Sequence, residues 1–140
     1  MSLRERGTMP LNIVVGLVAL LVALVFYSIG TWGAFRSGAV TRRHVTYLWI
    51  GFAFDVLATA MMAIAAGGLD LSPLADLLHT VVAFLGMFGM LAVAVVGSRA
   101  LARGSSTALA RLSRWVVAPW AIWVFVFVWG MISRGSARIG

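Results

Sequence analysis

Residues 11–33 read LNIVVGLVALLVALVFYSIGTWG, an apolar run of 23 residues without a charged side chain. A helix needs about 20 mainly apolar residues to cross the roughly 30 Å hydrocarbon core of a bilayer. This run is long enough to do so. It therefore predicts a transmembrane helix.

Three further tracts have spanning length, at 45–67, 74–97 and 115–132. The last is the shortest, but Ser105 or Ser106 could cap a helix that begins earlier, so we expect it over about 107–132. Pro119 would lie inside that helix and kink it.

The composition agrees with a membrane protein, since 62% of the 140 residues are hydrophobic and 11% are charged. Short connections between the tracts force neighbouring helices to run antiparallel. We therefore predict an all-α membrane protein, an up-down bundle of four transmembrane helices in one domain over residues 1–140.

Two classes of site are excluded by the residue inventory. The chain has no cysteine, which rules out disulfides, thiolate metal sites and cysteine nucleophiles. No hydrolase or phosphate-binding motif occurs either, so we expect no enzyme.

All eleven basic residues are arginines that flank apolar tracts, which predicts contact with membrane lipids and no nucleic-acid partner.

The distribution of the arginines predicts the orientation. Four lie near the termini and seven in the first and third connections, while the second connection carries Asp70, with Asp76 just after it. Because arginine-rich loops stay in the cytoplasm, we expect a multi-pass protein of the bacterial inner membrane with both termini outside. Arg4 and Arg6 could instead begin a signal peptide, but the long apolar run favours a spanning helix. The seven are Arg36, Arg42, Arg43, Arg99, Arg103, Arg111 and Arg114.

Asp55 is the ionisable residue nearest the expected bilayer midplane, about eleven positions from either end of its tract. A carboxyl at that depth usually faces the bundle interior. It could carry a proton, hold a cation or support a bound cofactor. Alternatively, a protonated aspartate could donate a hydrogen bond that fixes the packing. The stripe of this helix that contains it is His44, Leu48, Gly51, Asp55, Thr59 and Met62.

His79 is the second candidate, about six residues into the third tract. A neutral imidazole at this depth can ligate haem iron, or it can simply pack through a hydrogen bond. His44 should lie roughly 25 Å away along the membrane normal, so the two histidines cannot clamp one haem. A second axial ligand would come from the outer half of the bundle or from a second protomer. The candidates in this chain are Met61, Met62 and Met131.

His44 follows Arg42 and Arg43, and the three form a basic cluster. This cluster could hold carboxylates such as haem propionates, or it could contact lipid headgroups. Trp120 and Trp123 lie deep in the fourth tract, where each indole N–H needs a hydrogen-bond partner.

Several stretches together resemble the HsmA family, small bacterial haem-sensing membrane proteins. They are FYSIGTW at 26–32, the run from His44 through Trp49-Ile50-Gly51 to Asp55, His79, and the aromatic last helix ending in Trp129-Gly130. The resemblance covers about residues 25–133.

The resemblance implies a four-helix protein that binds haem b for haem sequestration or defence against oxidants. On this reading His79 ligates the haem iron, and His44, Asp55 and Met62 complete the expected cofactor-binding residues. Residues 91–95 read LAVAV, where family members often carry another histidine, so further ligation must come from other residues.

Two other functions remain open. A proton-coupled transporter, similar to small dimeric multidrug exporters, could use Asp55, although such exporters carry an acid in the first helix and only Asn12 stands there. The chain could also be an accessory subunit of a larger membrane complex. We therefore expect membrane lipids and haem as partners, with a homodimer or a larger complex as further possibilities.

Overall fold

The computed structural model describes the backbone of residues 10–65, 67 and 74–139, and the side chains of these residues except 74–76 and 134–139. In this part of the chain every regular element is an α-helix. Asp70 and Asp76, which entered the orientation argument, lie outside the described side chains. The helices are α1 (Leu11–Ser37), α2 (Arg42–Ala65), α3 (Leu74–Arg103), α4 (Ser106–Trp115) and α5 (Val117–Ile139).

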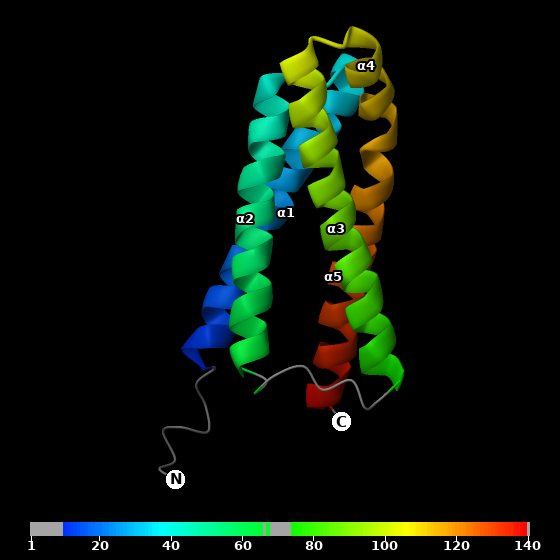
Figure 1. Cartoon of the computed structure of the whole chain (residues 1–140). Helices are drawn as coiled ribbons and strands as arrows, with labels where there is room; N and C mark the ends of the chain where they lie inside the picture. The colour runs from blue at the N-terminus through cyan, green and yellow to red at the C-terminus, as the bar shows by residue number, and fades with distance from the viewer. Residues whose placement is uncertain (1–9, 66, 68–73, 140) are drawn as a thin grey trace.

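The helices form an up-down bundle, as the sequence predicts (Figure 1). Four segments are long and apolar enough to cross a membrane, and α4 and α5 together make the fourth. α1 packs along α2, and α3 packs along α5. One end of the bundle, here called the arginine-rich end, holds the α1–α2 turn and the α3–α4 connection. At the opposite end α1 begins and α5 ends (Figure 1).

The turn between α1 and α2 is built from local backbone chemistry. Gly38 ends α1 in the left-handed conformation, with φ 75°. Glycine adopts this conformation without strain because it has no Cβ atom. Three residues later Thr41 precedes α2, and its backbone N–H donates to His44 Nδ1 at 3.1 Å. These two features reverse the chain within a few residues.

The helix ends at the arginine-rich end differ from the predicted ones. α1 continues to Ser37 and α3 to Arg103, beyond the expected ends at Gly33 and Gly97. Hydropathy marks only the lipid-spanning part of a helix, and these polar extensions continue the backbone hydrogen bonding outside it. Ser105 caps α4 as expected, because its Oγ accepts from the backbone N–H of Ala108 at 3.3 Å.

The fourth spanning segment is two helices, α4 and α5, separated at Val116. Pro119 has no N–H to donate to the carbonyl of Trp115, four residues earlier, so the regular pattern is interrupted there. The break lies three residues before the proline, at Val116, which keeps α-helical dihedral angles with φ −60° and ψ −27°; the expected kink stays a prediction.

Small and medium side chains fill the bundle core. Ala23, Leu48, Met90 and Ala94 are fully buried. Close helix approaches accompany them: a β-carbon at Gly97 of α3 would lie 2.9 Å from Val45 of α2. α2 and α3 are farther apart at the opposite end of the molecule (Figure 1). The tightest packing between the two hairpins is therefore at the arginine-rich half.

Candidate functional site

A polar cluster of three side chains occupies the middle of the bundle. The Tyr27 hydroxyl donates to Asp55 Oδ2 at 3.1 Å, and the Trp123 indole Nε1–H donates to the same oxygen at 2.9 Å. The three side chains are almost fully buried. They come from α1, α2 and α5, so one carboxylate oxygen joins three of the four spanning segments.

Bare glycine backbone makes room for this cluster. A β-carbon at Gly51 would lie only 2.6 Å from Cδ1 of Tyr27, so the phenol ring lies directly on the α2 backbone. On the other side, a β-carbon at Gly86 of α3 would lie 3.0 Å from Cα of Trp123. The Tyr27 and Trp123 rings meet edge to face, with centroids 5.2 Å apart. The close helix approaches thus fix the position of both donors.

The geometry around Asp55 is that of a structural centre. Both hydrogen bonds to the carboxyl come from neutral donors, and the residue is 4% exposed. Among the described residues no arginine or histidine reaches the carboxyl. Such a group can hold helices together. Both donors occupy Oδ2, and Oδ1 of the same carboxyl accepts neither of these two bonds.

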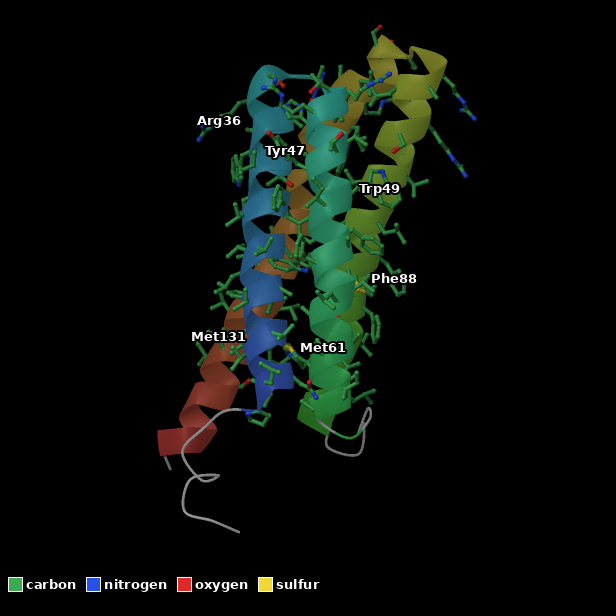
Figure 2. All side chains as sticks on the ribbon, turned by 90° about the vertical axis from the view of Figure 1, so that its left-hand side faces the viewer. Arg36, Tyr47, Trp49, Met61, Phe88 and Met131 are labelled. Atoms are coloured by element: carbon green, nitrogen blue, oxygen red, sulfur yellow. The ribbon has the colours of Figure 1, made fainter. Side chains whose placement is uncertain are left out.

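Two further indoles join helices that are distant in sequence. Trp120 Nε1–H donates to Ser28 Oγ at 3.1 Å, which links α5 to α1. Trp49 reaches from α2 toward α3 (Figure 2), where its Nε1–H donates to Ser98 Oγ at 2.9 Å. Trp120 and Trp123 therefore find the partners that their depth predicts.

His79 lies in the half of the bundle at the opposite end, packed on α5. A β-carbon at Gly130 would lie 3.0 Å from Cε1 and 3.5 Å from Nε2 of the imidazole. The Trp129 ring meets the imidazole edge-on, at a centroid distance of 5.6 Å. His79 is partly exposed, and Gly130 leaves the space that the ring needs. The contacts with Gly130 and Trp129 therefore fix the orientation of the His79 imidazole.

The methionine candidates do not gather around His79. A β-carbon at Gly16 of α1 would lie 3.3 Å from Cγ of Met62 and 3.5 Å from Cβ of Met61, both on α2. Both methionines therefore pack within the α1–α2 hairpin, whereas His79 packs on α5. Met131 is 52% exposed (Figure 2).

His44 serves the α1–α2 turn. Its Nδ1 accepts from the Thr41 backbone, and its Nε2 lies 2.8 Å from the position of a β-carbon at Gly33. One ring nitrogen is thus hydrogen-bonded and the other faces the α1 backbone. His44 and His79 lie toward opposite ends of the bundle, which agrees with the argument against bis-histidine ligation.

The predicted helix faces are largely observed. On α2 the buried stripe runs through Leu48, Gly51 and Asp55, but it continues with Ala58, whereas Thr59 is exposed. A straight α-helix has 3.6 residues per turn, so a step of four drifts out of the interface. On α3, the packed residues from Gly86 to Gly97 share one face of the helix. Its buried members are Gly86, Met90, Val93 and Gly97.

Comparisons of the chain with protein-family models, curated proteins and solved structures find no match. The arrangement of its own residues must therefore carry the functional argument. Over the described residues, no three histidine or acidic side chains converge as they would in a metal site built from side chains alone.

Proposed function

We propose that this chain is a non-enzymatic integral membrane protein that binds haem b through His79, for haem sequestration or defence against oxidants. The observation that carries the proposal is the fixed position of the His79 imidazole on α5, where it packs on Gly130 and meets the Trp129 ring edge-on. A neutral imidazole on a membrane helix is a common axial ligand of haem iron. The resemblance of this chain to the HsmA family supports the same assignment.

The surroundings of His79 are aromatic on one side, and α5 holds the imidazole in place. The Cε1–Nε2 edge of the imidazole packs on the α5 backbone at Gly130, so haem ligation through Nε2 would require the ring to turn away from α5, while Trp129 offers an aromatic surface beside it. When bound, haem would supply redox and ligand-binding chemistry, while the protein would orient it and shield it from water.

If His79 holds a haem, any further protein ligand would come from a second protomer. Met61 and Met62 pack against Gly16 in the other hairpin. Met131 is exposed on α5, where a neighbouring copy could approach it. A homodimer that shares haem is therefore part of the proposal.

The optical spectrum of the purified protein tests this function. The full chain, produced with haem supplementation, should show a Soret band. His79→Ala should lose the band, whereas His44→Ala is the matched control, because these are the chain's two histidines and His44 lies at the other end. His79→Gly supplied with free imidazole should regain it, since the small ligand can occupy the vacated position.

Two results would overturn the proposal. Colourless wild-type protein after supplementation excludes haem binding by the chain alone. Equal bands in His79→Ala and wild type exclude His79 as the ligand. Circular dichroism of each variant separates loss of haem from loss of the fold.

The alternatives receive less support from the geometry. In a proton-coupled transporter Asp55 would exchange protons with both sides, yet the residue is 4% exposed and its Oδ2 accepts hydrogen bonds from Tyr27 and Trp123. An accessory subunit would use the same centre to fix its own packing. Stable co-purification with a larger complex is the result that would favour that role.

The proposal places the protein in a bacterial inner membrane with both termini outside. Its support is the arginine distribution. Arg36 projects from the bundle at the arginine-rich end (Figure 2), and the other six arginines of the two connections belong to the same end.

A further inference from the structure

We propose that a cleft between the end of α3 and the start of α4 binds the phosphate of an anionic phospholipid. The cleft has a volume of about 300 Å³. This site is independent of haem and lies at the arginine-rich end of the bundle. Its lining residues are Val96, Arg99, Ala100, Arg103, Ser105 and Ala108.

The two arginines of this corner have no acidic residue near them in the sequence. Arg99 and Arg103 are one helical turn apart on α3, so their guanidinium groups repel each other. The four acidic residues of the sequence are Glu5, Asp55, Asp70 and Asp76, and none lies in the stretch 96–114. Asp55, the acid whose side chain is described, is bound to Tyr27 and Trp123. A phosphate would relieve this repulsion and accept hydrogen bonds from both arginines.

The lining changes from apolar to charged along α3. Val96, nearer the bilayer centre, is 48% exposed, and the arginines follow within the next two turns. A phospholipid has the same order, with acyl chains below and phosphate above. A soluble anion would make no favourable contact with the apolar end of the cleft. The change from apolar to charged lining therefore favours a phospholipid over free phosphate.

Helix lengths place the cleft at the headgroup level. α3 has 30 residues, and a helix of that length extends about 45 Å, well beyond a roughly 30 Å hydrocarbon core. Trp115, at the end of α4, is 67% exposed, and tryptophans gather at the membrane interface. α4, which runs from Ser106 to Trp115, therefore lies among the headgroups.

Lipid retention measured by native mass spectrometry tests the site. The full chain in detergent micelles is mixed with phosphatidylglycerol or with zwitterionic phosphatidylcholine. We expect a phosphatidylglycerol adduct that exceeds the phosphatidylcholine adduct. Arg99→Gln combined with Arg103→Gln should lower it at least tenfold, about what two interfacial arginines contribute. Ala108→Glu, which places a carboxylate in the cleft, should lower it similarly.

Arg36→Gln combined with Arg42→Gln is the matched control. It removes the same charge from exposed positions at the same end, on the other hairpin. We expect this pair to retain the adduct, and inorganic phosphate should not displace the lipid. If both double variants lose the phosphatidylglycerol adduct equally, the lipid is held by the overall positive charge of this end and not by a specific site, and the proposal is overturned. Equal retention of the two lipids, or displacement by inorganic phosphate, would overturn it as well.

Discussion

Asp55 shows how one buried acceptor can control the packing of three helices. In Asp55→Leu, the Tyr27 hydroxyl and the Trp123 indole N–H lose their acceptor inside the bundle. Unsatisfied buried donors cost about 1–3 kcal/mol each in water-soluble proteins and less in membrane proteins, so we expect a loss of about 2 kcal/mol. Asp55→Asn keeps a carbonyl oxygen that can accept both bonds and should lose less than about 1 kcal/mol.

Unfolding by titration with sodium dodecyl sulfate, followed by tryptophan fluorescence, measures both free energies. Equal unfolding of Asp55→Leu and wild type would contradict a structural role for the carboxyl. A normally folded Asp55→Asn variant that loses proton-linked transport would instead favour the transporter function.

Thr31 offers the opposite case, a buried hydroxyl that contributes no hydrogen bond. Its side chain is fully buried, and Oγ1 has no partner in the described structure. Thr31→Val has nearly the same shape and removes the unsatisfied group, so we expect unchanged stability or a gain of up to about 1 kcal/mol. The control is Ser113→Ala, because the equally buried Ser113 Oγ donates to the Ala110 carbonyl at 2.7 Å.

The same unfolding titration applies to this pair. Ser113→Ala should lose about 0.5–1 kcal/mol. A destabilised Thr31→Val variant would show that the hydroxyl does have a partner, for instance a bound water.

The polar residues of the interior could be identified from the sequence, but the hydrogen bonds between them could not. Depth marked Asp55 as a carboxyl facing the bundle, and it marked Trp123 as an indole that needed a partner. Tyr27 belonged to the stretch that resembles the HsmA family, but no role was predicted for its side chain. Pairing the one buried acid with the deep donors would have found the cluster. Which donor faces Asp55 depends on the rotation of α1 and α5, and single-sequence periodicity does not determine that rotation.

At the scale of helices, the close approach of α1 and α2 depends on Gly51. Replacing glycine by alanine favours a helix by about 1 kcal/mol, but here the added β-carbon would lie 2.6 Å from the Tyr27 ring. Overpacking typically costs about 1–3 kcal/mol, so we expect the steric term to win and Gly51→Ala to be destabilised.

A double variant isolates the cause of that loss. With Tyr27→Ala in the background, the ring is gone and Gly51→Ala should become neutral or stabilising. The unfolding titration compares the two backgrounds. If Gly51→Ala lowers the free energy of unfolding equally in both backgrounds, the added methyl group does not clash with the Tyr27 ring.

Helix ends were harder to predict than helix positions. Each spanning tract coincides with a helical segment because hydropathy reports the apolar length that lipid requires. The continuation of α3 to Arg103 carries no such signal because Ser98, Arg99 and Arg103 interrupt its apolar residues, although Ala100 is buried and Leu101 packs against the core. Pro119 did mark the division of the fourth segment, because the loss of its N–H affects the carbonyl four residues earlier.

For the whole molecule, composition and short connections were sufficient to predict the antiparallel four-helix bundle. They did not predict that α2 and α3 would diverge at the opposite end, which depends on side-chain volume in both hairpins (Figure 1). The packing of His79 on Gly130 could not be predicted from them either, because it is a long-range contact between α3 and α5.

The absence of cysteine makes the orientation of the whole molecule directly testable. Ser133→Cys and Ser106→Cys are matched substitutions, because both serines are exposed and lie toward opposite ends of the fourth spanning segment. Arginine-rich connections remain cytoplasmic, so a membrane-impermeant maleimide should label Ser133→Cys in spheroplasts and label Ser106→Cys only after permeabilisation. The reverse pattern would place the arginine-rich end outside, and the proposed phospholipid site would then face the outer leaflet.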